Sequence, residues 1–261
     1  MLDGMALALG AATGSFLNVA IYRLPRGESV VAPRSHCTKC ERVIPWYDNI
    51  PVLSWILLRG RCRGCGEPFS IRYPIVEALT GVILLGLSLQ LGWSIGLAFA
   101  FYFACSLLVV TYIDLEHRII PDRVTLPGIV VALGLALVSA WYAPPELRWH
   151  QLQQWAIGML VGGGILWLVA WGYALATGRE GMGGGDIKLL AMIGAFLGWQ
   201  GVLLSLLLAS FIGSIIGVGI MLVRGGDTKL AIPFGPFLAL GAMVSLLWGD
   251  EIVRWYLSTI L

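Results

Sequence analysis

Charged residues are scarce in this sequence. Asp, Glu, Lys and Arg make up 12% of the 261 residues, about half of their share in soluble domains, whereas 58% of the residues are hydrophobic. This imbalance excludes a soluble globular domain. The formal net charge is only +2, and nothing in its distribution points to a nucleic-acid partner. The composition therefore predicts an integral membrane protein, with the lipid bilayer as its first partner.

Apolar stretches long enough to cross about 30 Å of hydrocarbon, roughly 20 residues each, recur along the chain. A further stretch, 187 to 199, would reach only about 20 Å as a helix, so it must begin or end within the membrane, or the bilayer must thin around it. We predict an all-α polytopic membrane protein with about eight transmembrane helices. The seven longer spans are 4 to 22, 74 to 92, 94 to 113, 124 to 142, 153 to 176, 201 to 223 and 232 to 248.

The first span lacks the basic residues that lead a secretory signal peptide. Asp3 precedes it, whereas Arg23 and Arg26 follow it, so we expect a retained helix with its N-terminus outside. Nine of the 17 Lys and Arg residues lie between Arg23 and Arg72. The positive-inside rule places this segment in the cytoplasm, together with the loops at 114 to 123, 177 to 186 and 224 to 231.

Four of the five cysteines form two C-x2-C pairs separated by 21 residues, in the segment between the first two spans. Each short turn can direct two thiolates toward one tetrahedral ion, and Gly64 and Gly66 ease the second turn. An insert of this size is too small to be stable by apolar burial alone, so we expect a structural metal. The predicted ligands are Cys37, Cys40, Cys62 and Cys65.

Alternatives to this site follow from the same residues. Disulfides are the alternative for these cysteines, but cytoplasmic thiols stay reduced. Zinc is the expected ion and iron the alternative. His36, next to Cys37, could compete as a ligand, and Cys105 lies in an apolar span where packing is its expected role.

Carboxylates near the membrane are the strongest candidates for function, because a charge in hydrocarbon is costly. Asp114 follows the third long apolar span, and Asp186 precedes the short one, so both lie at the cytoplasmic boundary. Two carboxyl groups at one depth suit an aspartic hydrolase, in which one takes a proton from water and the other polarises the scissile carbonyl. The alternatives are an ion pair of Asp114 with Arg118, and an N-cap for Asp122.

The ends of the helices predict different roles for the two acids. Asp186 would open a helix, where unpaired N–H groups favour an anion, and Asp114 would close one, where carbonyl groups disfavour it. Asp186 is therefore expected to be the ionised base and Asp114 to hold the shared proton.

The glycines before Asp186, in "EGMGGGDIKLL", suggest a loop that contacts the substrate. Lacking Cβ atoms, Gly183, Gly184 and Gly185 permit positive φ and the close approach of an extended substrate strand. The alternative is a flexible connection between two spans.

Five blocks in one order resemble the bacterial type IV prepilin peptidases, which are membrane aspartyl proteases with a GxGD signature. They are "GSFLNVAIYRLPRGE", the cysteine segment with "IPWYDNIPVLSW", "IRYPIVEALTG", "YIDLEHRIIPD" and "IPFGPFLALGA", together with "EGMGGGDIKLLAMIGAFLGWQ" around the signature itself. The resemblance places the catalytic acids on Asp114 and Asp186 and the metal ligands on the four paired cysteines.

The resemblance also implies a function. Such a protein of the bacterial inner membrane cleaves the basic leader of type IV prepilins and type II secretion pseudopilins after a glycine, on the cytoplasmic side. It then N-methylates the new terminal residue with S-adenosylmethionine. Leader lysines and arginines would favour Glu116, Asp122 and Glu180 at the mouth of the site.

The domains expected on this basis are a first transmembrane helix at 1 to 22, a zinc insert linked to methylation at 23 to 73, and a peptidase domain at 74 to 261. No glycine fingerprint for the methyl donor is present, and the insert is too small for a Rossmann domain. Asn18, Arg23 and Glu77 are polar residues near it whose ordinary roles would be interhelical hydrogen bonds or a lipid anchor. A transporter and a noncatalytic scaffold with a metal knuckle are the competing functions.

Overall fold

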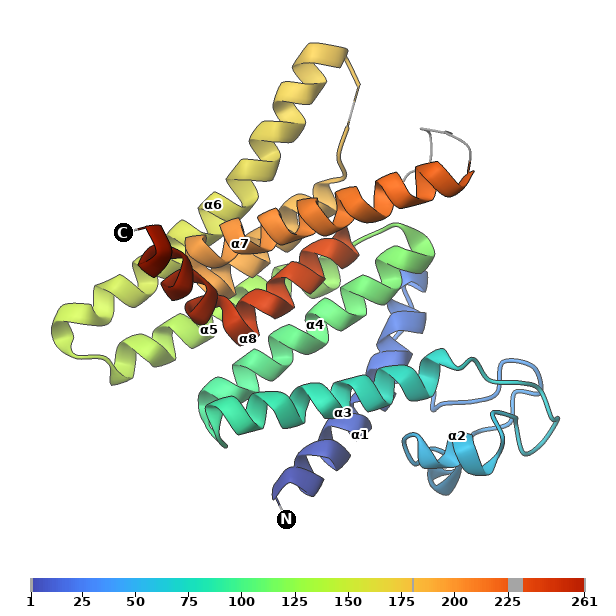
Figure 1. The fold of residues 1–261 in the computed structure, drawn as a ribbon. Helices are drawn as coiled ribbons and strands as arrows, with labels where there is room; N and C mark the ends of the chain where they lie inside the picture. Colours follow the sequence, from blue (N-terminus) through green and yellow to red (C-terminus); the bar gives the residue numbers. More distant parts are fainter. Residues whose placement is uncertain (1, 180, 225–231, 261) are drawn as a thin grey trace. The chain divides into compact units, whose positions relative to one another are not determined.

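The computed structural model describes residues 2–179, 181–224 and 232–260, and it is helical almost throughout (Figure 1). Two isolated bridges, His36 with Val43 and Arg61 with Pro68, are the only extended pairings in the described residues. The α-helices are α1 (Leu2–Arg23), α2 (Leu53–Leu57), α3 (Arg72–Leu91), α4 (Ile95–His117), α5 (Asp122–Tyr142), α6 (Pro145–Thr177), α7 (Gly184–Arg224) and α8 (Gly235–Ile260), with short 3-10 turns η1 (Leu24–Arg26) and η2 (Trp46–Asp48).

Seven of the described helices are long and apolar enough to cross a membrane, which confirms the predicted fold class. The predicted spans 187 to 199 and 201 to 223 both lie in α7, whose 41 residues would extend about 60 Å if straight, twice the hydrocarbon thickness. The helix is instead broken at Gly198, where φ is 70° and ψ is −179°. The break separates the short span from the long one, as the apolar pattern predicts.

Two helices extend beyond the apolar stretches that predicted them. Helix α6 begins at Pro145 rather than near 153, and α8 continues to Ile260 rather than ending near 248. The extra turns carry exposed Trp149 and Trp255. Aromatic and polar side chains of this kind suit the membrane–water interface, where backbone hydrogen bonding continues although the apolar pattern has ended.

The chain forms two compact units, Met1–Cys105 and Ser106–Leu261, and α4 contributes to both. In the first unit α1 packs against α3, and the insert lies between these two helices in the sequence. Small residues permit this contact: a Cβ on Gly14 would lie 2.7 Å from the Cα of Glu77, and one on Gly10 equally close to that of Gly81. The polar ends of α1 and α3 next to the insert are thereby held together.

In the second unit α7 packs against α5, α6 and α8 (Figure 1). The contact with α6 is backbone to backbone. A Cβ built on Gly158 would lie 2.0 Å from the carbonyl oxygen of Gly194, and one on Gly162 would lie 2.2 Å from that of Leu190. This contact fixes the short first segment of α7, which begins next to Asp186.

Substitution of Gly158 by alanine should destabilise the second unit strongly. The added methyl group would overlap a backbone carbonyl that cannot rotate away, so we expect a loss of about 3 kcal/mol or more. Gly164 lies on the same helix, and a Cβ there meets nothing within 4 Å, so Gly164→Ala is the matched control. Thermal unfolding in detergent measures both, and equal melting temperatures would contradict the prediction.

Candidate active site and metal centre

Asp114 lies near the C-terminal end of α4, and the residue is 5% exposed. Its Oδ2 accepts a hydrogen bond from the amide of Gly235, at 3.1 Å. Gly235 is the first residue of α8. A Cβ at this glycine would lie 2.6 Å from Oδ2, so only glycine allows the two groups to approach this closely.

Asp186 lies in the first turn of α7, in the same unit as Asp114. Its Oδ1 is buried without a hydrogen-bond partner among the described residues. The two carboxyl groups are close enough to interact electrostatically. Ile120 contacts both sides of this site, because its side chain lies within 3.2 Å of the Cβ positions of Gly185 and Gly235. The structure thus brings together the two acids that the sequence singled out.

Gly235 and Ile120 were not among the predicted site residues. Both lie in blocks that the sequence comparison with the peptidase family had already marked, "IPFGPFLALGA" and "YIDLEHRIIPD". Neither glycine nor isoleucine has an ionisable side chain, so no feature of the sequence selected these two residues. Their role follows from the fold, which brings the start of α8 and the turn between α4 and α5 to Asp114.

Helix ends do not separate the two acids as expected. Asp114 closes α4, but it also faces the N-terminal amide of α8, and Asp186 lies in the first turn of α7. Both carboxyl groups therefore lie at positive ends of helices, where an anion is favoured. The prediction that Asp114 carries the proton because it ends a helix was incomplete, since it considered only its own helix.

The sequence also allowed purely structural roles, an ion pair with Arg118 for Asp114 and an N-cap for Asp122. In the described part of the chain no ion pair joins Asp114 to Arg118. Asp122 is the first residue of α5 rather than its N-cap, which is Pro121, and it forms an exposed ion pair of 2.7 Å with Lys188. Glu180 lies outside the described residues.

The three predicted loop glycines differ from one another in the structure. Gly184 and Gly185 belong to the first turn of α7, and Gly183 precedes it; none has positive φ. A Cβ at Gly185 would lie 2.8 Å from that of Ile120, which explains this glycine by packing. At Gly184 a Cβ meets nothing within 4 Å, and at Gly183 it meets only Oδ2 of Asp186, at 3.9 Å. Open space therefore lies at both positions, and at Gly183 it adjoins Asp186.

The four paired cysteines form a single cluster in the first unit. Their sulfur atoms all lie within 4.8 Å of one another, with Cys37 and Cys65 at 3.8 Å and Cys40 and Cys62 at 4.0 Å. Tetrahedral zinc with bonds of about 2.3 Å requires sulfur atoms about 3.8 Å apart. The donor set and spacing fit one zinc-sized ion, for which the four cysteines would supply all four ligands.

The two cysteine turns have the same backbone pattern. The amide of Cys37 donates to the carbonyl of Arg42, and that of Cys62 to the carbonyl of Glu67. The residue after each second cysteine is left-handed, Glu41 with φ 56° and Gly66 with φ 73°. An ion pair of 2.6 Å between Lys39 and Glu67 joins the two turns. This repeat shows how two short segments present four sulfurs to one point.

The competing ligand and the fifth cysteine are both outside this cluster. Nδ1 of His36 lies 3.1 Å from the carbonyl oxygen of Arg34, and the ring is not part of the group of close ligand atoms. Cys105 is buried in α4, away from the insert in sequence, as expected for a packing residue.

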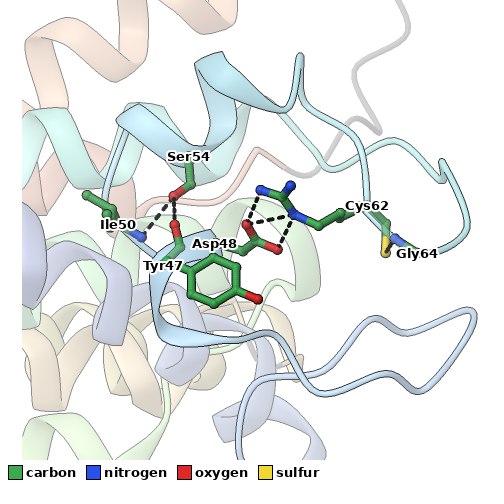
Figure 2. Close-up of polar contacts among 7 residues, drawn as sticks. Tyr47, Asp48, Ile50, Ser54, Cys62 and Gly64 are labelled. Atoms are coloured by element: carbon green, nitrogen blue, oxygen red, sulfur yellow. Dashed lines mark hydrogen bonds and ion pairs between the residues drawn. The ribbon is translucent and has the colours of Figure 1, made fainter.

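An ion pair connects the second cysteine turn to the loop before α2 (Figure 2). Arg63, which follows Cys62, donates to both carboxylate oxygens of Asp48 at 2.7 to 3.1 Å. The guanidinium holds the pKa of the Asp48 carboxyl below its usual range. Figure 2 also shows Ser54 accepting from the amide of Ile50 and donating to the carbonyl of Tyr47, each at 3.0 Å. The metal centre is thereby tied to an ordered loop.

That loop forms part of the wall of a cavity of about 290 Å3 in the first unit. The other walls are α1, the segment after it, α2 with the segment that follows it, and the start of α3. Asn18, Arg23 and Glu77, the three polar residues noted in the sequence, all line it. Arg23 is buried and donates to the carbonyls of Ser29 and Pro33, so it is not a lipid anchor.

Fold and site together define an integral membrane protein with two interacting aspartates in one unit and a four-cysteine cluster in the other. Residues 8–91 match the bacterial peptidase A24 N-terminal domain, and residues 101–218 match the type IV leader peptidase family. The chain belongs to the type IV leader peptidase family, and it is a membrane aspartic peptidase.

Relatives match almost the whole chain. A protein of Aeromonas salmonicida named prepilin leader peptidase/N-methyltransferase is 41% identical over 275 residues, which cover 95% of this chain and 91% of the relative. Proteins of the same name are 37% identical in Pseudomonas putida, over 95% and 91% of the two chains, and 35% identical in Pseudomonas aeruginosa, over 97% and 92%. No solved structure matches this chain.

Proposed function

We propose that this protein cleaves the leader of type IV prepilins and type II pseudopilins after a glycine, with Asp114 and Asp186 as the catalytic pair, and N-methylates the new terminal residue. The carrying observation is that two carboxyl groups from α4 and α7 converge in one unit, closely enough to interact. The names of the relatives supply the substrate class. A transporter or a noncatalytic scaffold would not account for membership of a peptidase family.

The two acids would share one proton between them, with a water molecule held against both. One carboxylate takes a proton from the water as it attacks the leader-glycine carbonyl, and the protonated partner donates to the carbonyl oxygen. Because such a pair titrates jointly, its two proton equilibria belong to the pair. The amide of Gly235 stabilises the charged form of Asp114, and the unpartnered Oδ1 of Asp186 is available to the water or the substrate.

The substrate would lie along Gly183 and Gly184. The open space at both positions leaves room for an extended strand beside Asp186. A small residue on the substrate, such as the leader glycine, allows close approach of the two backbones. The apolar stem of the prepilin stays in the bilayer, which puts the cleaved bond at the membrane boundary.

The site is assigned to the cytoplasmic face of the bacterial inner membrane. The support is the excess of Lys and Arg in the segment from Arg23 to Arg72 and the alternation of spans, including the crossing that the Gly198 break adds. Glu116 and Asp122 are exposed acids near the mouth of the proposed active site, and their charge suits a basic leader. Asp122 is already paired with Lys188, so a leader cation would compete for it.

The remaining parts of the chain receive separate roles. We assign residues 1 to 22 to the first transmembrane helix, 23 to 73 to a zinc insert linked to methylation, and 74 to 261 to the part of the chain that carries the two peptidase acids. S-adenosylmethionine would supply the methyl group, and the zinc bound by the four cysteines would stabilise the insert without taking part in a step.

Incubation of the detergent-solubilised protein with a purified prepilin, with and without S-adenosylmethionine, tests this function directly. The product mass should show loss of the leader in both samples and one added methyl group only with the donor. Intact prepilin in both samples would contradict the peptidase assignment, and an unmodified cleaved product would contradict the methylation.

Gly235→Ala provides a test of the geometry around Asp114. The new Cβ would lie 2.6 Å from Oδ2, so the carboxyl group must move away from its position opposite Asp186. A displacement of about 1 Å costs on the order of 100-fold in rate, and we expect leader cleavage to fall at least tenfold. Gly219→Ala, on α7 with nothing within 4 Å of its Cβ, should cleave like the unmodified protein. Equal cleavage rates for the two variants would count against the assigned geometry.

A further inference from the structure

We propose that the 290 Å3 cavity in the first unit is the binding site of the methyl donor, with Glu77 and Asn18 as its main polar contacts and the metal centre as the support of its wall. This inference rests on the proposed methylation. No glycine fingerprint in the sequence marks the site, so the assignment depends on what the folded unit brings together.

The cavity has the size and the surroundings that a nucleoside-containing ligand requires. Its volume of about 290 Å3 is near the lower limit of typical small-molecule sites. Tyr22, Trp55, Phe69 and Tyr73 contribute aromatic rings to the lining. Such rings can stack on an adenine base. Three carboxylates, from Glu28, Asp48 and Glu77, offer acceptors for hydroxyl and ammonium groups.

Asn18 has an unused acceptor at this cavity. The residue is 1% exposed, and its Nδ2 donates to the carbonyl of Tyr73 at 3.1 Å, which confirms the interhelical hydrogen bond expected from the sequence. Its Oδ1 is buried with no partner in the described part of the structure. Leaving such an oxygen unsatisfied is costly, so a ligand that donates to it would bind favourably. The amino groups of the methyl donor are donors of this kind.

Glu77 is a buried carboxylate for which the described residues supply no cation. Its side chain is 7% exposed, one oxygen accepts from the amide of Val52 at 2.8 Å, and Ser15 is its second hydrogen-bond partner. The nearby Arg23 is occupied by the carbonyls of Ser29 and Pro33. A charge buried in this way is stabilised by a counter-charge. The sulfonium of S-adenosylmethionine is a cation of suitable size.

The reaction at this site would be a direct displacement. The terminal amine of the cleaved substrate first gives one proton to water, and its nitrogen then attacks the methyl carbon. The bond between that carbon and sulfur breaks, and its electron pair stays on sulfur, so the sulfonium becomes the neutral thioether of S-adenosylhomocysteine. The cationic donor becomes a neutral product, which would weaken its attraction to Glu77 and favour release.

The metal centre is coupled to the cavity through Arg63 and Asp48. Arg63 lies next to the predicted ligand Cys62 and forms an ion pair with Asp48, and Asp48 lines the cavity together with its neighbours Asn49 and Ile50. Removal of the ion would release the turn that carries Arg63, and with it this wall. Donor binding and metal binding should therefore strengthen each other.

Binding of radiolabelled S-adenosylmethionine to the purified full-length protein tests the site without any turnover. Glu77→Gln keeps the shape of the side chain and an acceptor for the amide of Val52, but removes the charge, and we expect affinity to fall about tenfold or more. Asn18→Leu should weaken binding as well. Glu251→Gln, an exposed position on α8, is the matched control with unchanged affinity. Bound metal, measured on each variant, reports whether the insert has folded.

The outcomes separate this inference from the proposed function. Equal donor affinity in Glu77→Gln and Glu251→Gln, with metal retained, overturns the site. Loss of donor binding on chelation of the metal, restored by zinc, supports the coupling, whereas unchanged binding in the metal-free protein overturns it. Should the unmodified protein bind the donor but leave prepilin intact, the cleavage proposal fails while the binding site stands.

Discussion

Asp114→Asn and Asp186→Asn are each expected to lower the rate of leader cleavage by roughly 100- to 10,000-fold. This is the usual contribution of a group that transfers a proton in the transition state. Asparagine has nearly the same shape as aspartate, and at position 114 its side-chain oxygen can still accept from the amide of Gly235. The loss would therefore report missing proton transfer rather than a rearranged site.

The experiment compares both variants with Asp250→Asn, which changes an exposed acid on α8. Single-turnover cleavage of a purified prepilin gives the chemical rate free of product release. A dead Asp186→Asn enzyme beside a nearly fully active Asp114→Asn enzyme would exclude a catalytic pair. Equal, large losses with Asp250→Asn unchanged would support it, and the double variant should then be little worse than either single one.

Substitution of a paired cysteine by serine should remove the metal and unfold the insert. A serine hydroxyl does not ionise near neutral pH, so the ion would lose one of four thiolate ligands. Structural zinc contributes on the order of 10 kcal/mol to the folding of small domains, more than the insert can replace by apolar burial. Cys62→Ser should reduce the bound metal from about one ion per chain to a small fraction of that.

Cys105→Ser is the matched control, because Cys105 is buried in α4 and does not belong to the cluster. Elemental analysis measures the ion and distinguishes zinc from iron. Limited proteolysis should cut the insert of Cys62→Ser within the segment between α1 and α3 and leave Cys105→Ser resistant. Retention of a full complement of metal by Cys62→Ser would contradict the four-ligand centre.

Periodic and compositional features of the sequence predicted most of the fold. Apolar length alone located each helix of the described residues that is long and apolar enough to cross a membrane, and the short stretch 187 to 199 predicted a separate segment that the Gly198 break confirms. The predicted helix ends were inaccurate at the start of α6 and the end of α8, where the helices continue beyond the apolar stretches. Hydropathy reports the solvent around a helix rather than the hydrogen bonds within it.

The candidate sites differ in how far local sequence could predict them. The cysteine centre was fully predictable because each C-x2-C turn directs its two sulfurs by local geometry. The pair Asp114 and Asp186 was predicted from its expected depth in the membrane and from the family resemblance. The surroundings of Asp114 were not predicted, because the amide of Gly235 that contacts it is 121 residues away in the sequence. The position of Asp114 at the end of α4 predicted that an anion is disfavoured there, whereas the amide at the start of α8 favours one.

By itself, the sequence determined that the chain spans a membrane, which four cysteine sulfurs come together, and which two acids lie close enough to interact. These properties depend on composition and on spacings of a few residues. The tertiary structure decided that α8 supplies a donor to Asp114 and that Asn18 and Glu77 share a cavity with the insert. Such contacts arise when distant helices pack through glycines, and no local pattern encodes which backbone groups will then meet.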